Sequence, residues 1–394
     1  MLFGELIHQK ALLLVNTIGS IMIQRLIKKN LEQALFKGKT ILLIGPRQVG
    51  KTTLIKEILS DRDYLFLDGD DPLIRTYLTN PNTKEIETII GQATVVFIDE
   101  AQRIENIGLT AKIIHDQFKD VQLILSGSSA LELKTHTHEQ LTGRKREFNL
   151  FPISYAEYEN NTGFVSAAGD LETRLVYGFY PEAITSRGEE REVLNEISQS
   201  YLYRDILALA NIKKPEVLEK ILQALAFQIG SEVSYNEIAQ LTGVDKNTVA
   251  NYIHLLEISY IIFPLTSFSR NLRNEIKTNR KIYFYDNGIR NAVIQNFNPI
   301  ELRDDVGALW ENFLISERLK HNSYSRHFGN RYFWRTKQQQ EIDYVEERDG
   351  RITGYEFKWN PKAKAKIPSN FVETYNAEIK VISKDNFRTF VGLD

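Results

Sequence analysis

Short apolar runs alternate with amphipathic stretches between about residues 22 and 152. Nearly continuous apolar runs separated by helices are typical of parallel strands that are covered on both faces of a sheet. The pattern therefore predicts an α/β fold for this part of the chain. The expected strands are 41–44, 64–67, 95–98, 122–125 and 147–150.

The pattern changes to helical periodicity after Pro152. Residues 153–211 are expected to be mostly helical, starting with a capping box of Ser154 and Glu157. Between residues 214 and 268, helical segments are separated by a short turn at Gly243 and followed by the apolar segment 260–265. This succession predicts a winged helix-turn-helix, with Asp245 capping its second helix.

Two strand-like segments near the C-terminus, 341–345 and 352–358, flank the dipeptide Asp349-Gly350. This dipeptide is preferred in two-residue hairpin turns. If it is the turn, Asp343 and Glu356 lie directly opposite each other, and Lys358 shares their face because side chains alternate along a strand. The sequence thus predicts a hairpin that carries two facing carboxylates and a lysine.

The most specific chemical motif follows the first predicted strand and precedes a helix. It has the spacing of a P-loop, in which backbone N–H groups surround phosphates, Lys51 contacts the β- and γ-phosphates and Thr52 coordinates Mg²⁺. We therefore expect ATP and Mg²⁺ as cofactors. The residues of the motif are Gly45, Pro46, Arg47, Gln48, Val49, Gly50, Lys51, Thr52 and Thr53.

A second motif supports hydrolysis. The strand 95–98 ends at Asp99 and Glu100, an arrangement typical of a Walker B element. In that element Asp99 holds Mg²⁺ through water and Glu100 polarises the attacking water. Ser126 follows another expected strand and is either a sensor of the γ-phosphate or part of an ordinary turn.

Arg144 lies in a basic turn before the last expected strand. It is either an arginine finger, for its own site or for that of a neighbouring subunit, or a solvated cation. A finger that acts on a neighbour requires an oligomer.

The winged helix has two interpretations. As a DNA-binding element it presents a recognition helix and phosphate contacts; the alternative is a protein contact or an ATPase lid. The recognition candidates are Lys246, Asn247, Asn251 and His254, the phosphate contacts are Arg270, Arg273, Lys277, Arg280 and Lys281, and a further basic tail comprises Arg326, Arg331, Arg335 and Lys337.

The facing carboxylates of the C-terminal hairpin also have two interpretations. Two opposed carboxylates repel each other unless a cation or a proton lies between them. Asp343 and Glu356, with Glu311 from a preceding helix, could bind a metal while Lys358 activates water for phosphodiester cleavage. Alternatively, Lys358 neutralises the pair on a solvated face.

Bulk properties narrow the class of protein. The chain has 394 residues, a net charge of −2 and 42% hydrophobic residues, which predicts two or three domains and excludes a generally basic nucleic-acid binder. Zero cysteines exclude disulfides and fit a cytoplasmic location. The apolar run at 11–15 is too short to cross a membrane, and we expect residues 1–21 to be a poorly ordered leader.

Together these motifs resemble a group of prokaryotic AAA-type P-loop ATPases whose C-terminal domain of unknown function is similar to PD-(D/E)XK nucleases. The resemblance includes the P-loop, the Walker B strand and several later motifs. These later motifs are Ser126-Gly127-Ser128, Leu141-Thr142-Gly143-Arg144, Gly178-Phe179-Tyr180-Pro181, Tyr203-Arg204-Asp205-Ile206, Gly307-Ala308-Leu309-Trp310-Glu311-Asn312, Glu341-Ile342-Asp343-Tyr344 and Glu356-Phe357-Lys358.

The resemblance implies an AAA-like ATPase core (22–152), a winged helix-turn-helix (212–300) and a restriction-endonuclease-like α/β domain (301–394). The sequence pattern adds the leader (1–21) and a helical lid or connector (153–211). The resemblance also implies that Asp343, Glu356, Lys358 and Glu311 carry any cleavage chemistry. The chain departs from the nuclease motif because Ile342 stands where the motif has proline.

The leading hypothesis is a cytoplasmic ATPase that couples its nucleotide state to the winged helix and the tail and acts on DNA. The alternatives are a metal-dependent nuclease licensed by ATP, or a nucleotide-gated module that binds a protein partner and has no nuclease activity.

Overall fold

A computed structural model describes residues 23–128, 140–199, 214–269 and 280–393. The leader expected for residues 1–21 lies outside this range. The same holds for the motif at 203–206 and for the candidate phosphate contacts Arg270, Arg273 and Lys277.

The first sheet contains all five strands expected in this part, each within two residues of its predicted limits. They are β1 (Thr40–Ile44), β2 (Leu65–Asp68), β3 (Val95–Asp99), β4 (Gln122–Gly127) and β5 (Lys145–Asn149). All are parallel, in the order β2-β3-β4-β1-β5. Every residue of β1 and β3 is buried, as expected of strands covered on both faces.

Two of the helices in this part begin at side chains that cap them. Asp71 caps α4 (Pro72–Leu78), and Asn82 with Glu85 forms a capping box at α5 (Thr83–Ile90). The remaining helices of this part are α2 (Lys28–Ala34), α3 (Lys51–Ile58), the 3₁₀ turn η1 (Ala101–Arg103) and α6 (Ile107–Gln117).

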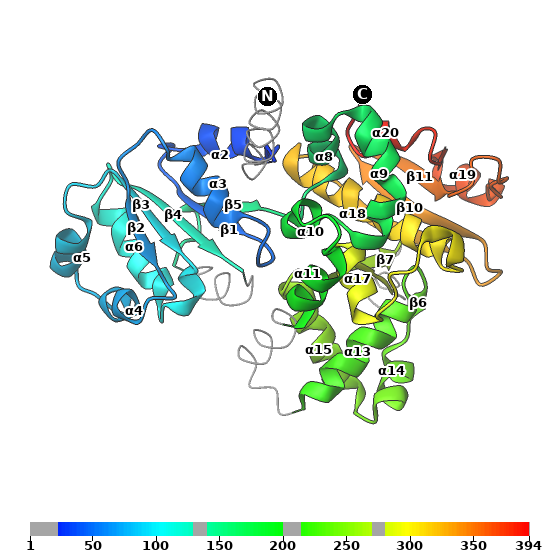
Figure 1. Ribbon diagram of the computed structural model, residues 1–394, viewed down its shortest axis with the longest axis horizontal. Helices are drawn as coiled ribbons and strands as arrows, with labels where there is room; N and C mark the ends of the chain where they lie inside the picture. Colours follow the sequence, from blue (N-terminus) through cyan, green and yellow to red (C-terminus); the bar gives the residue numbers. More distant parts are fainter. Residues whose placement is uncertain (1–22, 129–139, 200–213, 270–279, 394) are drawn as a thin grey trace, which may run out of the picture.

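The connector begins at the predicted capping box of Ser154 and Glu157. Its helices are α8 (Tyr155–Thr162), α9 (Phe164–Tyr177), α10 (Pro181–Thr185) and α11 (Glu190–Ile197). They lie with the C-terminal half of the chain rather than over the first sheet (Figure 1), and α9 and α11 pack on α17 (Asn287–Val293). Among the connector helices, α10 lies closest to the P-loop.

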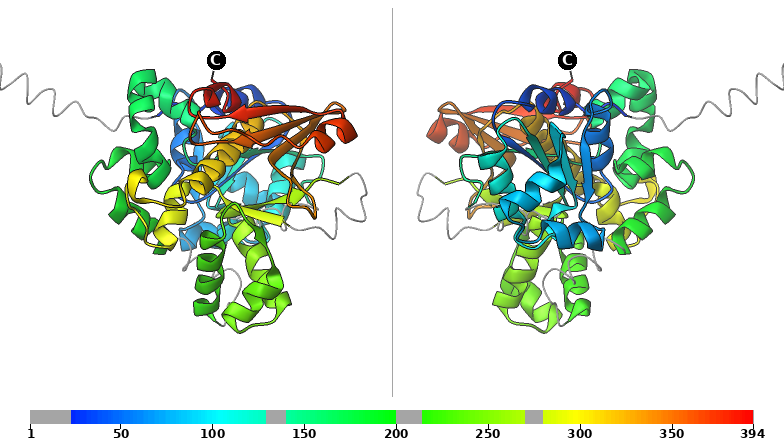
Figure 2. Two further views of the ribbon diagram at one scale, coloured as in Figure 1. Left: turned by 90° about the vertical axis from the view of Figure 1, so that its right-hand side faces the viewer. Right: turned by 90° about the vertical axis from the view of Figure 1, so that its left-hand side faces the viewer.

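The helical trio expected between residues 214 and 258 is present. It consists of α13 (Pro215–Phe227), α14 (Tyr235–Thr242) and α15 (Lys246–Ile258). Gly243 ends α14 in a left-handed conformation, and the Asp245 side chain accepts hydrogen bonds from the N–H groups of Asn247 and Thr248. Figure 2 shows this trio projecting away from the two sheets. On α15, Lys246, Asn247, Asn251 and His254 are exposed.

The second sheet has seven strands in the order β12-β11-β10-β9-β7-β8-β6. It joins the strands that follow α13 and α15 to the C-terminal hairpin through a parallel pairing of β7 with β9. The sheet therefore crosses residue 300, where the sequence suggested a domain boundary. The strands are β6 (Glu232–Val233), β7 (Ile262–Ser267), β8 (Arg280–Phe284), β9 (Asn330–Arg335), β10 (Glu341–Arg348), β11 (Arg351–Phe357) and β12 (Glu378–Ile382).

The hairpin of β10 and β11 has the predicted register. Tyr344 pairs with Tyr355, and the turn residues Asp349 and Gly350 have φ angles of 50° and 75°. Positive φ at both turn positions is typical of a type I′ turn. On its other side, β10 changes register against β9 between Ile342 and Val345, so a β-bulge lies beside Asp343.

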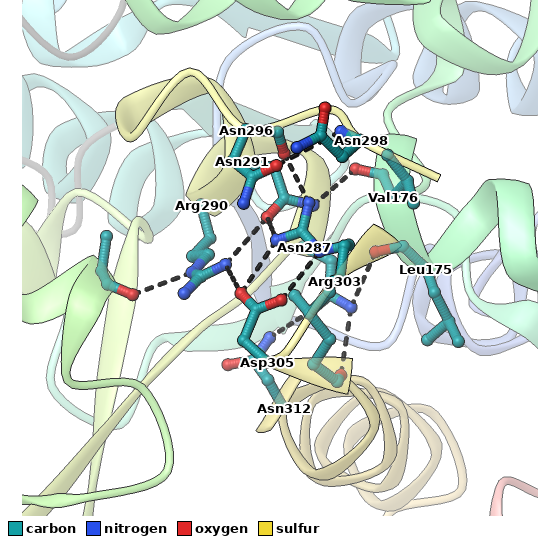
Figure 3. Close-up of polar contacts among 12 residues, drawn as sticks. Leu175, Val176, Asn287, Arg290, Asn291, Asn296, Asn298, Arg303, Asp305 and Asn312 are labelled. Atoms are coloured by element: carbon teal, nitrogen blue, oxygen red, sulfur yellow. Dashed lines mark hydrogen bonds and ion pairs between the residues drawn. The ribbon is translucent and has the colours of Figure 1, made fainter. Parts of the chain in front are cut away.

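The long helix α18 (Val306–Tyr324) packs on this sheet with α20 (Phe387–Phe390), while α19 (Ser369–Tyr375) contributes Phe371 to a second apolar cluster. Between α9, α17 and α18 lies a buried polar network (Figure 3). Asn287 donates to the carbonyls of Leu175 and Leu309, both at 3.1 Å. Arg290 and Arg303 share the carboxylate of Asp305, which offsets part of their charge.

Arg25 connects the two halves of the molecule. Its guanidinium lies 3.2 Å from Glu157 Oε1 and donates to the carbonyls of Val49 at 2.7 Å and Phe151 at 2.6 Å. The Tyr324 hydroxyl is 3.4 Å away. Burial tends to lower the pKa of Arg25, but Glu157 and Tyr324 outweigh it and keep this pKa above its ordinary value. One buried cation thus holds the P-loop, the end of the first sheet, the connector and α18 together.

Replacing Arg25 with Ala is expected to lower the free energy of unfolding by about 3–5 kcal/mol, because Glu157 would remain buried without its cation. Chemical denaturation of the full chain measures this change. Lys28→Ala is the matched control: Lys28 pairs with Glu57 at 2.6 Å on a more exposed surface, where loss of an ion pair costs less than about 1 kcal/mol. Equal losses in the two variants would contradict the role given to Arg25.

Candidate functional site

The P-loop joins the carboxyl end of β1 to the start of α3. Gly45 is required there because a Cβ atom would lie 1.9 Å from the carbonyl oxygen of Leu150. Gly50 precedes α3 with a φ of 90°, a left-handed conformation that favours glycine. These two glycines let the loop turn tightly and point the first N–H groups of α3 toward an anion.

Lys51 is buried beneath this loop. Its ammonium group donates to the carbonyls of Gly45 at 3.0 Å and Pro46 at 2.7 Å. Burial lowers the pKa of Lys51 to about 8, although Glu100 and Asp99 act in the opposite direction. Glu100 and Asp99 compensate the positive charge of Lys51 only in part. Phosphate oxygens bound in the loop would supply the remaining negative charge.

Thr52, Asp99 and Ser126 meet at the carboxyl ends of neighbouring strands. The Thr52 hydroxyl donates to Asp99 Oδ2 at 2.5 Å, and Ser126 donates to the other oxygen of the same carboxylate. The parallel order of β1, β4 and β3 produces this meeting, because β4 lies between the strands that precede Thr52 and carry Asp99. The structure therefore brings together three residues that the sequence had proposed separately.

Glu100 follows Asp99 and has a φ of 44°. Its carboxylate accepts a hydrogen bond from Gln102 and lies 3.5 Å from the Ser128 hydroxyl. Gln102 also donates to Ser128 at 3.0 Å. The sequence analysis assigned no role to Gln102. The feature that could have indicated one is its position, two residues after Glu100 at the end of a predicted strand.

A cavity of about 230 Å³ adjoins the P-loop on its α10 side. The sequence gave no indication of it, because its walls come from segments far apart in the chain. Its lining includes Ile23, Gly50, Thr53, Ile153, Pro181 and Thr185. A partly apolar cavity next to a phosphate-binding loop has the character expected of a site for a planar ring system.

Arg144 does not reach this site. It immediately precedes β5, and its carbonyl accepts from Thr40 N at the start of β1. It therefore lies at the amino edge of the parallel sheet, opposite the P-loop, and its side chain pairs with Asp116 at 2.8 Å. The expectation of a finger for the domain's own nucleotide is wrong; contact with a neighbouring subunit stays a prediction.

Glu311, Asp343 and Glu356 do not gather as a three-carboxylate group, and metal binding by these residues stays a prediction. Among the residues that the structure describes, no three His, Cys, Asp or Glu side chains come together as they would to hold a metal ion. Glu311 instead contacts Lys281 at 3.1 Å and accepts from the Tyr283 hydroxyl at 2.6 Å. Glu341 contacts the same ammonium group at 2.5 Å. A lysine thus supplies the positive charge expected of a metal.

Lys281 was expected to contact phosphate, and this expectation is also wrong. The residue is 1% exposed, and Glu311, Glu341 and Asp343 together raise its pKa against the effect of burial. Sequence reasoning could not detect this because Lys281 lies within an otherwise basic segment.

The hairpin carboxylates depend on neighbouring donors. Asp343 accepts from Phe357 N at 2.8 Å, and Glu356 accepts from Lys358 at 2.7 Å. Burial raises the pKa of Asp343 well above its ordinary value, and the charges of Glu311 and Glu356 add to this effect. Burial also raises the pKa of Glu356, against the opposing effect of Lys358.

The solvent-facing surface of α15 agrees with the expected recognition face. Lys246, Asn247, Asn251 and His254 are all exposed. Arg280 donates to the Tyr235 hydroxyl at 3.0 Å and lies over the same ring, so it supports the helices beside this face.

Comparison with known families divides the chain into three segments. Residues 37–159 match a family model described as an AAA domain. Residues 168–299 and 306–389 match two models described as domains of unknown function (DUF8612 and DUF4143). With the five-stranded parallel sheet, the first match identifies residues 37–159 as an AAA-type P-loop ATPase domain.

Curated relatives and solved structures were also found. An uncharacterized protein of Mycobacterium tuberculosis is 26% identical over 362 residues, which are 89% of this chain and 78% of the relative. One of Methanocaldococcus jannaschii is 24% identical over 70% of this chain and 67% of its own length. The structure of a Walker-type ATPase of Pyrococcus abyssi is 14% identical and covers 68% of this chain and 94% of that one, with a TM-score of 0.46.

A search of the described residues for helices long and apolar enough to span a membrane found none.

We expect Asp343→Asn to stabilise the protein at pH 8. Because the pKa of Asp343 is raised on folding, the native state binds more protons than the unfolded state above the ordinary pKa, and stability falls as the pH rises. Asn stays neutral and can still accept from Phe357 N. The gain is about 1.4 kcal/mol for each unit by which the pKa is raised.

Urea denaturation at pH 8 and pH 4 measures this gain. It should shrink at pH 4, which is close to the ordinary Asp pKa of 3.8, because the unfolded state is then partly protonated as well. Glu373→Gln, at an exposed position of α19, is the control and should change stability by less than about 0.5 kcal/mol. A destabilised Asp343→Asn protein at pH 8 would contradict the expectation.

Proposed function

We propose that this protein is an ATPase that binds ATP with Mg²⁺ at the P-loop and hydrolyses it. The observation that carries the proposal is the meeting of Thr52, Asp99 and Ser126 beside the buried ammonium group of Lys51. A hydroxyl and a carboxylate are oxygen ligands of the kind that Mg²⁺ accepts when it also binds nucleotide phosphates. The AAA-domain match over residues 37–159 supports the same conclusion.

Each side chain has a definite part in this reaction. Lys51 exchanges its carbonyl partners for the β- and γ-phosphates, and the first N–H groups of α3 hold the remaining oxygens. Thr52 and Asp99 would hold Mg²⁺, which neutralises phosphate charge when bound. Glu100, oriented by Gln102 and close to Ser128, positions the attacking water. Ser126 reports the γ-phosphate through the Asp99 carboxylate.

The cavity beside α10 is the proposed site for the nucleoside. It is continuous with Gly50 and Thr53 of the P-loop, and Ile23, Ile153 and Pro181 provide apolar wall. Because Pro181 and Thr185 belong to the connector, a bound nucleotide would touch both halves of the molecule. This contact gives the two nucleotide states different interactions, which coupling requires.

Lys51→Ala is expected to abolish ATP turnover and to weaken nucleotide binding, since the buried cation would be lost. Glu100→Gln is expected to keep nucleotide affinity within a few-fold while turnover falls by at least about 100-fold, as for loss of a water-positioning group. Phosphate release and fluorescent-nucleotide titration measure the two quantities. Glu105→Gln, at an exposed position of the same segment, is the control. Normal turnover in Lys51→Ala would refute the proposal.

DNA is the proposed target of the winged helix-turn-helix. Support comes from the exposed polar face of α15, which carries Lys246, Asn247, Asn251 and His254, and from its projection away from both sheets (Figure 2). A projecting helix with amide side chains toward solvent can enter a major groove, where amides pair with adenine.

The test is binding of duplex DNA and its effect on ATP turnover. We expect duplex to raise turnover of the full chain, and Lys246→Gln with Asn251→Ala to weaken duplex binding at least about tenfold, from one phosphate contact and one base contact. Lys84→Gln on α5 is the charge-matched control. If duplex DNA does not change ATP turnover and the α15 variant binds duplex as well as the parent chain, a protein partner is favoured instead.

We further propose that the acidic cluster of the tail is an internally paired junction without nuclease activity. Lys281 pairs with Glu311 and Glu341, and Lys358 pairs with one oxygen of Glu356. Three of the four carboxylates therefore have a protein cation beside them, while Asp343 accepts from Phe357 N. This favours the binding-module alternative over the metal-dependent nuclease. Plasmid cleavage with Mg²⁺ or Mn²⁺ that disappears in Asp343→Asn would overturn it.

A further inference from the structure

A cleft of about 1120 Å³ lies between the first sheet and the C-terminal hairpin. One wall is β5, an edge strand that pairs only with β1 among the described strands. The opposite wall contains the end of α18, the start of β9 and the turn at Asp349 and Gly350. The nucleotide site and the acidic cluster lie outside its lining.

Unpaired cations line this cleft. Arg146, Arg326 and Arg331 form no ion pair with any described residue, and the last two are exposed. Three acids also line the cleft, and each has a partner of its own: Glu147 lies 2.6 Å from Lys145, Asp349 lies 3.4 Å from Arg348, and Glu347 accepts from the Asn330 amide at 3.3 Å. The cleft therefore offers uncompensated guanidinium groups from both of its walls, which suits a ligand with several separated negative charges.

Aromatic rings lie among these cations. Phe328 is 84% exposed between Arg326 and Arg331, and the Arg326 guanidinium lies 5.4 Å from the centre of the Phe148 ring. Tyr285 stacks on Phe151 at 5.6 Å at the base of the cleft. Phe328 therefore presents an aromatic ring to solvent on which a flat partner can stack.

We propose that this cleft binds single-stranded nucleic acid. Alternating guanidinium groups and aromatic faces are the features that hold a phosphodiester backbone while successive bases stack. Paired duplex bases stack on each other and have no free faces for Phe328. A peptide added to the β5 edge would use backbone groups and leave the three arginines uncompensated.

This inference goes beyond the proposed ATPase and concerns a different surface from α15. If the cleft does not bind single-stranded nucleic acid, the proposals of ATP hydrolysis and of duplex binding by α15 are not affected. The residues involved lie outside the P-loop site, so variants in the cleft should keep basal ATP turnover.

The test is fluorescence anisotropy of the full chain with a labelled oligothymidylate of about 20 nucleotides, which exceeds the usual site size. We expect the plot of log affinity against log salt to have a slope of about −2, from three phosphate contacts at about −0.7 each. Arg326→Gln and Arg331→Gln should each reduce this slope by about 0.7. Phe328→Ala should weaken binding about tenfold without changing the slope.

Two control variants remove similar groups elsewhere. Lys84→Gln removes an exposed cation of α5, and Tyr77→Ala removes an exposed ring of α4; both should bind like the parent chain. No binding of the oligonucleotide, or equal binding by the cleft variants and the controls, would overturn the proposal. So would binding of an acidic unstructured peptide that depends on Arg326 and Arg331 when the oligonucleotide does not bind.

Discussion

The buried guanidinium of Arg25 is the interaction on which the arrangement of the molecule depends. A charge removed from water is tolerated only when its donors are satisfied, and Arg25 meets this requirement with groups from four separate segments. The condition can be fulfilled only when the P-loop, the end of the first sheet, the connector and α18 are all in place. The desolvation penalty thus selects one relative position of the two halves.

This constraint gives the nucleotide site a route to the rest of the chain. Arg25 binds the carbonyl of Val49 inside the P-loop and contacts Tyr324 at the end of α18. The same helix carries Glu311 in the acidic cluster, and its end lies beside the arginine-lined cleft. A change in the P-loop that moves the Val49 carbonyl would therefore disturb Arg25 and its contact with Tyr324 of α18. Because α18 borders both the acidic cluster and the cleft, such a change could reach these two regions.

The local elements were largely predictable from sequence, because their causes are local. The P-loop, the five parallel strands and the hairpin register follow from glycine spacing, apolar runs and a turn dipeptide. The position of Arg144 was misjudged because its distance from the phosphates depends on the direction of β5 in the sheet. Lys281 was misjudged because burial among acids from α18 and β10 is a long-range property. The role of Arg25 could not be predicted, because its partners are two backbone carbonyls and two side chains that lie far from it in the sequence.

The second sheet has a consequence for how the chain is made. Its parallel pairing of Thr266 with Tyr332 joins residues that are 66 positions apart, whereas the first sheet is complete once residue 149 has been synthesised. Contacts between distant residues form slowly, and unpaired strand edges are prone to aggregation. On the ribosome, β7 and β8 therefore emerge as an incomplete sheet whose open edge waits for β9, just as β1 earlier waits for β4 and β5. This second interval is a further stage of biosynthesis at which an unpaired strand edge is exposed.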